Sequence, residues 1–415
     1  MKKYKLGEIC TIVPGYAFKA TDFGKGLNYV IKIKDIMPPY IDILHSEKVE
    51  TVIDKKYEIK YGDFVMAMTG ATIGKIGKLQ IDSESKIYIN QRVCKFIPEA
   101  FCDKEYLYYK LNTQEFQQFI YNNVDSKLAQ PNIGHPTIYK YELELPLLSE
   151  QRRIGQFLKA IDDKIALNRS INHNLEAMAK QLYDYWFVQF DFPDENGKPY
   201  KSSGGKMVWN EKLKREIPEG WHCGNLFEIA VFTNGLACQK FRPKPGEKPL
   251  PVIKIREMHD GISSNPEEVS PNIPESVKVY NGDVLFSWSA SLEVMVWADG
   301  LGGLNQHIFK VTSANGFPKS FYYFQLLNYV DVFKKMAEAR KTTMGHITQD
   351  HLQQSTIAIP NDKDIAYKFE KRVSPILTGM VKQQEVISIL TKLRDSLLPL
   401  LMNGQVSVNY DLSND

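Results

Sequence analysis

The chain has 415 residues, more than a single hydrophobic core usually supports, so we expect more than one domain. Its 52 Lys and Arg against 49 Asp and Glu leave a net charge of only +3, so charge alone does not indicate nucleic acid. The odd count of five cysteines, with no Cys-x-x-Cys pair, favours a reducing cytoplasm. No run reaches the ~20 apolar residues that a membrane span needs.

Residues 1–148 are predicted to form a β-rich domain. Apolar runs at 29–34, 64–68 and 87–97 are typical of strands, and the Tyr- and Leu-rich pattern at 103–122 predicts a helix. The pattern then changes to a helix that we expect over 149–190.

Residues 191–218 are polar and rich in Pro, Gly and Ser, which predicts a linker or a long surface loop. A second β-rich domain is expected over 219–361, with a strand at 252–255 and a helix at 319–340. A second long helix is expected over 362–404, followed by a tail at 405–415.

The two β-rich segments share four short stretches in the same order, which predicts a duplicated domain. The matched stretches are 30–36 with 252–258, 62–66 with 282–286, 90–92 with 305–307, and 145–146 with 359–360.

Both long helices carry a seam whose positions alternate by three and four residues, as in a coiled coil. The positions expected to pair the helices are Leu158, Ile161, Ile165, Asn168, Asn172, Leu175 and Leu182, and Ile376, Met380, Gln383, Ile387, Leu390 and Leu397. Polar residues interrupt the seam at Asn168, Asn172, Gln383 and Arg394. Such residues either fix the register of the pair or lie at a solvated edge, and the sequence leaves both open.

Three catalytic signatures are incomplete. The stretch 37–40 has Met before Pro-Pro-Tyr, where an amino-methyltransferase needs a polar residue. The glycine-rich stretch 70–75 is one residue short of a phosphate loop, and Ile76 stands where a magnesium-binding hydroxyl is needed. Asp63 and 84–86 have the order of a nuclease site, but the second copy has no matching Glu-x-Lys.

Several short motifs occur along the chain, at 6–9 and 226–229, 217–221, Gly62-Asp63 with Gly70 and Gly74, Asn90-Gln91, 145–154 and 186–193. Together these motifs resemble those of type I restriction-modification DNA-specificity subunits. The likeness covers nearly the whole chain, although the second copy lacks the paired glycines and the Glu-Gln-Arg-Arg run of the first.

The resemblance implies an α+β fold in which two repeated β-rich target-recognition domains are separated by two long antiparallel coiled-coil helices, with pseudo-two-fold symmetry. It also implies a non-catalytic subunit that reads a bipartite, asymmetric site in double-stranded DNA. Its expected partners are two methyltransferase subunits and the restriction-translocase subunits, with no membrane. S-adenosylmethionine, ATP and magnesium would bind those partners, and this chain would hold no cofactor or metal.

Polar and basic loop residues are the candidates for DNA contact, because such side chains reach base edges and phosphates. They are Lys19, Thr69, Thr72, Lys75, Lys127 and Gln130 in the first domain, and Lys240, Arg242, Arg256, Ser287, Ser289, Lys341 and His346 in the second. Two alternatives stay open: a two-headed scaffold that does not bind DNA, and an unrecognised nuclease or methyltransferase.

Overall fold

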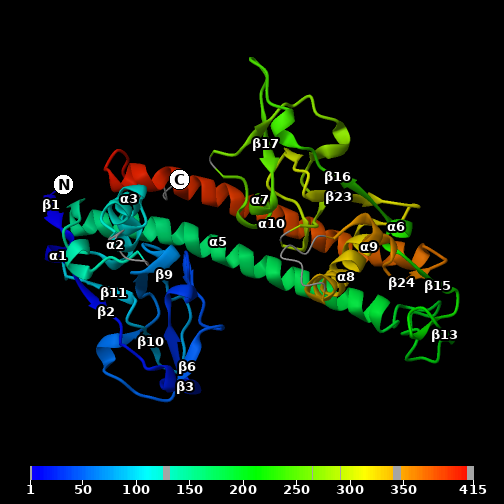
Figure 1. Cartoon of the computed structure of the whole chain (residues 1–415), viewed down its shortest axis with the longest axis horizontal. Coiled ribbons are helices and arrows are strands. Elements are labelled where there is room, and N and C mark those ends of the chain that lie inside the picture. The colour runs from blue at the N-terminus through cyan, green and yellow to red at the C-terminus, as the bar shows by residue number, and fades with distance from the viewer. Residues whose placement is uncertain (1, 125–130, 264, 290, 340–346, 409–415) are drawn as a thin grey trace, which may run out of the picture. The chain divides into compact units, whose positions relative to one another are not determined.

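The computed structural model describes residues 2–124, 131–263, 265–289, 291–339 and 347–408. The chain divides into two compact units, one of residues 1–163 with 392–415 and the other of residues 164–391. Each unit contains one β-rich head and part of both long helices (Figure 1). We call residues 2–145 head 1 and residues 221–360 head 2.

Head 1 contains a sheet of order β2-β11-β8-β9-β5-β4, a sheet of order β6-β3-β10-β7 and the pair β1-β12. Its strands are β1 (Lys2–Lys5), β2 (Cys10–Pro14), β3 (Phe23–Ile31), β4 (Ile36–Met37), β5 (Tyr40–Ile41), β6 (Glu47–Val49), β7 (Glu58–Ile59), β8 (Phe64–Ala67), β9 (Ile76–Lys78), β10 (Ile87–Ile89), β11 (Val93–Pro98) and β12 (Glu142–Leu145). Its helices are α1 (Leu6–Ile9), α2 (Lys104–Leu111), α3 (Gln114–Asn122) and α4 (His135–Ile138).

Head 2 repeats this topology, except for β5 and β4, with the orders β16-β23-β20-β21 and β18-β17-β22-β19 and the pair β15-β24. Each head has an equivalent parallel strand pair, β3 with β10 in head 1 and β17 with β22 in head 2. The strands of head 2 are β15 (Trp221–Gly224), β16 (Ala230–Asn234), β17 (Leu250–Ile253), β18 (Glu268–Val269), β19 (Lys278–Val279), β20 (Val284–Ser287), β21 (Glu293–Val296), β22 (Gly302–Leu304), β23 (Ile308–Ser313) and β24 (Ile357–Pro360). Its helices are α6 (Leu226–Ile229), α7 (Ile255–Asp260), α8 (Lys319–Ala339) and α9 (Gln349–Gln353).

The duplication extends to individual side-chain contacts. In each head a lysine after the parallel strand forms an ion pair, Lys32 with Glu47 and Lys254 with Glu267. In each head a second lysine donates to a backbone carbonyl, Lys95 to that of Glu58 at 2.6 Å and Lys310 to that of Lys278 at 2.8 Å. These shared contacts confirm the two repeated domains that the sequence predicts.

Two elements of head 1 are interrupted where the sequence predicts continuity. The strand expected over 87–97 is divided into β10 and β11, because the chain turns at residues 90–92 and passes from one sheet to the other. The helix expected over 103–122 is divided into α2 and α3, because Thr113 caps a new helix and its side chain accepts a hydrogen bond from the Phe116 amide.

The two long helices are α5 (Leu148–Tyr183), which continues as a π-helix over Asp184–Val188, and α10 (Asp364–Met402). In the first unit Asp162 of α5 contacts Arg394 of α10. In the second unit Tyr183 of α5 lies 6.2 Å from Phe369 near the start of α10. In each unit α5 and α10 lie side by side and antiparallel, as the resemblance implies.

The seam positions are buried to different degrees. Those that are buried are Leu158, Ile161, Ile165, Asn168 and Ile387. Those that are half-buried are Asn172, Leu175, Leu182, Ile376, Met380, Gln383, Leu390 and Leu397.

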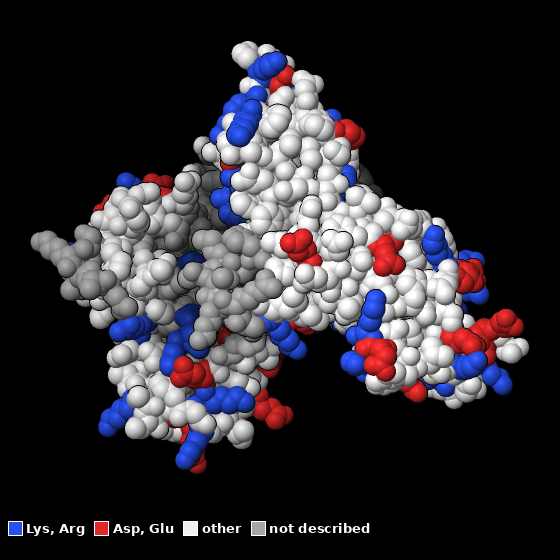
Figure 2. All heavy atoms as spheres, turned by 45° about the vertical axis from the view of Figure 1, so that its right-hand side comes forward, with Lys and Arg blue, Asp and Glu red and all other residues white. Residues whose placement is uncertain are grey.

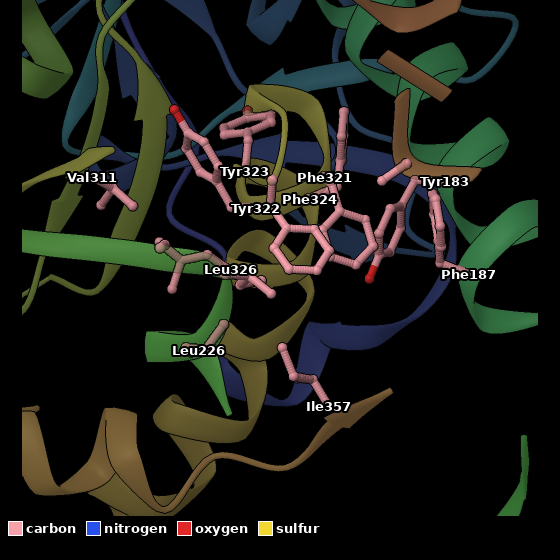
Figure 3. Packing of buried hydrophobic residues seen from close by; sticks show 14 of the residues in the cluster. Tyr183, Phe187, Leu226, Val311, Phe321, Tyr322, Tyr323, Phe324, Leu326 and Ile357 are labelled. Carbon is pink, nitrogen blue, oxygen red and sulfur yellow. The ribbon is translucent and has the colours of Figure 1, made fainter. Parts of the chain in front are cut away.

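The end of α5 lies in the core of head 2 (Figure 3). The ring of Tyr183 stacks on Phe324 of α8 with centroids 5.5 Å apart, and Phe187 meets Phe321 edge-on at 5.0 Å. Burying such aromatic rings contributes strongly to stability, so this helix end is an integral part of the second unit.

The segment 191–218, which the sequence predicts as a linker or surface loop, is ordered and partly buried. Strands β13 (Met207–Asn210) and β14 (Arg215–Pro218) pair antiparallel in it. Phe192 stacks on Tyr200 at 4.8 Å and on Trp221 at 5.6 Å. The polar composition hid this packing, because a few aromatic side chains suffice to attach the segment to the core of head 2.

Candidate nucleic-acid interface

Four segments of head 1 meet where β2 and β8 end and β11 begins, at one end of the strands of its larger sheet, and we call this site rim 1. The Gln91 amide donates to the Tyr16 carbonyl at 2.9 Å, and the Met68 amide donates to the Arg92 carbonyl at 2.9 Å. The Ile133 amide in turn donates to the Met68 carbonyl at 3.0 Å. Rim 1 therefore joins residues 15–16, 90–92, 68–75 and 131–133.

Head 2 has the same arrangement, which we call rim 2. The Trp288 amide donates to the His307 carbonyl at 3.3 Å, and the Ile347 amide donates to the Trp288 carbonyl at 2.9 Å. Leu236 forms a parallel bridge to Asn305, as Tyr16 does to Asn90. Rim 2 therefore joins residues 235–236, 305–307, 288–289, 291–293 and 347.

A glycine holds two of these segments together in each rim. A Cβ on Gly15 would lie 2.2 Å from the Asn90 carbonyl oxygen, and a Cβ on Gly235 would lie 2.2 Å from that of Asn305. No side chain fits at such a distance, so the backbone approach requires glycine in both heads.

Rim 1 presents cations and hydroxyls. Gln91, Arg92 and Lys75 are exposed, and Tyr16 is 38% exposed. The hydroxyl of Thr69 is buried without a hydrogen-bond partner in the part of the chain that the structure describes, and so is that of Thr72. Buried hydroxyls without partners are uncommon in native proteins, and these two lie within the rim.

Rim 2 presents aromatic and imidazole groups. The Trp288 ring lies 5.5 Å from the His307 ring, and its Nε1 donates to Asn234 Oδ1 at 3.2 Å. His307 Nε2 lies 3.3 Å from Gln306 Nε2, and His307 Nδ1 has no hydrogen-bond partner among the described residues. The same backbone therefore carries a different set of side chains.

The charge of one equivalent position is reversed between the rims. Strand pairing places Lys75 next to Ala67 in head 1 and Glu293 opposite Ser287 in head 2. Glu293 Oε2 lies 3.2 Å from His259 Nδ1. Over the face shown in Figure 2, basic and acidic side chains are interspersed, so no large basic patch dominates this view.

The predicted DNA contacts are distributed unevenly over the two heads. Thr69, Thr72 and Lys75 lie in rim 1, whereas Lys19 and Lys240 are exposed in the loops that follow β2 and β16. Two arginines have acidic partners: Arg242 lies 3.3 Å from Glu267, and Arg256 lies 2.5 Å from Glu257. The predicted contacts outside the described residues are Lys127, Gln130, Lys341 and His346.

Ser287 has to be removed from the candidates. It is fully buried, its hydroxyl donates to the Ser291 carbonyl, and it accepts from the Glu293 amide at 3.0 Å. It occupies the place of the buried Ala67, since both residues end a central strand. Ser289 is equivalent to Thr69 but only 7% exposed.

Sequence reasoning missed several rim side chains as candidate contacts. They are Tyr16, Gln91, Arg92, Trp288, Gln306 and His307. The repeated Asn-Gln pair at 90–91 and 305–306 was the available signal, because a polar pair that recurs between two apolar strands marks an exposed turn.

The suspected catalytic residues have structural roles. Asp63 accepts from the Lys60 amide at 2.8 Å and pairs with Lys104, while Glu84 is exposed. Pro39 belongs to a turn whose carbonyl accepts from the Lys78 amide at 3.0 Å. Among the described residues no group of His, Cys, Asp and Glu could hold a metal ion.

No helix in the described ranges is long and apolar enough to cross a membrane.

Two relatives carry names of type I restriction enzyme subunits. The MjaIX specificity subunit of Methanocaldococcus jannaschii is 24% identical over 79% of this chain and 74% of its own length. The HindI specificity subunit of Haemophilus influenzae is 23% identical over 98% of this chain and 99% of its own length.

A solved S subunit of a type I restriction-modification system from M. genitalium has a similar fold. The TM-score is 0.57 at 14% identity, over 96% of this chain and 95% of that one. The family profile described as "Type I restriction modification DNA specificity domain" matches residues 1–177 and 218–400, one match for each head with its helix. Since these matches cover most of the chain, it belongs to the family of type I restriction-modification DNA-specificity proteins.

Proposed function

We propose that this chain reads double-stranded DNA through rim 1 and rim 2, with one half-site for each head. The observation that carries the proposal is that the same four-segment rim recurs with different side chains. A shared backbone would position both heads on DNA in the same way, while different side chains would read different bases. The recognised site would therefore be bipartite and asymmetric.

The chain is a recognition subunit, and the chemistry would belong to its partners. Two methyltransferase subunits would bind S-adenosylmethionine and methylate a flipped adenine, and restriction-translocase subunits would use ATP and magnesium. Because the proposed substrate is cellular DNA, we expect the assembly to act in the cytoplasm.

Selective methylation of DNA by the assembled complex tests the proposal. The chain is co-expressed with a methyltransferase subunit of a type I restriction-modification system, and the methylated positions of the host DNA are mapped. We expect two short fixed sequences separated by a fixed number of unspecified base pairs. The purified chain alone should transfer no methyl group, and methylation by it would contradict the assignment of the chemistry to the partner.

Substituting the rims links the site to the function. Rim 1 variants should alter only one of the two fixed sequences, and rim 2 variants should alter only the other. Methylation that occurs without any fixed sequence would favour the alternative of a scaffold that does not read DNA.

A further inference from the structure

Among the polar seam positions, Arg394 differs from Asn168 and Asn172 in its contacts. Asn168 is only 2% exposed, and its Nδ2 has no hydrogen-bond partner within the described ranges. The Oδ1 of Asn172 also has none there. Arg394 of α10, in contrast, donates from Nη1 to Asp162 Oδ1 of α5 at 2.8 Å. Its contact joins the two helices at one defined position.

The same carboxylate also binds head 1. The hydroxyl of Tyr109 on α2 donates to Asp162 Oδ2 at 2.6 Å. The side chain of Asp162 is 11% exposed and that of Arg394 is 21% exposed, so water screens the pair only weakly. Burial disfavours the charged form of Arg394, but the hydrogen bonds and charges of Asp162 and of the adjacent Asp395 prevail and raise the pKa of the guanidinium.

A second buried pair continues this connection to the sheet. Lys78 of β9 is 5% exposed, pairs with Glu105 of α2, and lies 4.0 Å from the ring centroid of Tyr108. Burial lowers the pKa of Lys78, while the charge and hydrogen bond of Glu105 oppose that shift. Polar contacts therefore run from β9 through α2 and α5 to α10, all within the first unit.

An apolar seam alone does not define how far one helix is shifted along the other. A shift by one helical turn moves the helix by about 5.4 Å and restores a similar apolar match. One base pair of DNA is about 3.4 Å long, so such a shift exceeds the spacing that separates one base pair from the next. A buried polar contact excludes the shifted states, because they leave the carboxylate of Asp162 without its cation, although Arg394 keeps its second partner, Asp395, on the same helix.

We propose that Tyr109, Asp162 and Arg394 are positioning residues that set the register of α5 against α10 at head 1 and thereby make DNA recognition sensitive to the spacer length between half-sites. This inference rests on the proposed function, and it assigns to these three residues a role in recognition without contact to DNA.

The test compares Asp162→Asn with its neighbour Asp163→Asn as a matched control. Asp163 pairs with Lys159 on the same helix, and its side chain is 53% exposed. The full chain, assembled with its methyltransferase, is titrated with duplexes that carry the mapped site or the same half-sites with one base pair added. The readout is the affinity for the mapped site divided by the affinity for the lengthened site. This ratio does not depend on how much of a preparation is folded.

We expect Asp162→Asn to lower this ratio at least tenfold and Asp163→Asn to leave it unchanged. If Asp162→Asn keeps the ratio of the unmodified assembly, the inference is overturned. If the unmodified assembly itself binds both duplexes equally, the bipartite reading under the proposed function fails instead.

An apolar replacement separates positioning from stability. The variant Tyr109→Phe, Asp162→Leu, Arg394→Met removes both charges of the Asp162–Arg394 pair together, and such replacements often keep or increase stability. We expect the unfolding midpoint of this triple variant to equal that of the unmodified chain, while its affinity ratio stays as low as that of Asp162→Asn. Recovery of the ratio in this variant would show that the three residues matter only for stability, and would overturn the inference.

Discussion

The two heads share a scaffold and differ at their rims. The order of the strands they share, the parallel pair and the glycine at the close approach are the same in both. At the rims, Arg92 corresponds to His307 and Lys75 to Glu293. The difference teaches that side chains needed for the fold were retained after duplication, whereas side chains that face outward from the rim diverged.

The first prediction would break the comparison at the shared glycine. In Gly15→Ala the new Cβ meets a backbone carbonyl that cannot move aside, so we expect a loss of about 1–3 kcal/mol or more in the free energy of unfolding. Recognition of the first half-site should be lost with it. Denaturant unfolding and methylation mapping measure the two effects, and Gly235→Ala should do the same to the second half-site.

Gly134→Ala is the control for that experiment, because its Cβ would meet only Pro136 Cδ at an ordinary 3.4 Å. A Gly15→Ala variant as stable and selective as this control would show that the rim does not depend on the close approach.

The second prediction sharpens the comparison at equivalent readers. Arg92→His should change the preference at one base pair of the first half-site by about 1–3 kcal/mol, and His307→Arg should do so in the second. The measurement is binding to duplexes with single base-pair changes. Arg153→His, at an exposed position of α5, is the control. Altered preference in the opposite half-site would mean that the heads are assigned to the wrong half-sites.

The third and smallest effect concerns the reversed charge. Lys75→Ala should weaken binding to all sequences about equally and reduce the slope of log affinity against log salt by about 0.9, as for one lost phosphate contact. Glu293→Lys should increase that slope by a similar amount, since it adds a cation at the equivalent place. A change confined to one base pair would identify Lys75 as a base reader instead.

Much of the fold could be predicted from the sequence because its signals are local. The seam periodicity predicted α5 and α10, and the four repeated stretches predicted two similar heads. The residues of the candidate DNA interface were harder to predict from the sequence. Lys75 and Thr69 follow from a glycine-rich loop, but Ser287 was chosen for its residue type and is buried. The orientation of the Ser287 side chain depends on which face of β20 meets the core, and a serine is equally compatible with either face.

The sequence by itself determined the duplication, the two long helices and the family, because periodicity and repeated motifs are properties of neighbouring residues. Only the tertiary structure decided which segments meet at each rim and that Asp162 joins Arg394 and Tyr109. Those contacts link residues far apart in the chain, and the backbone hydrogen bonds and buried charges that select them exist only once the sheets and helices have packed together.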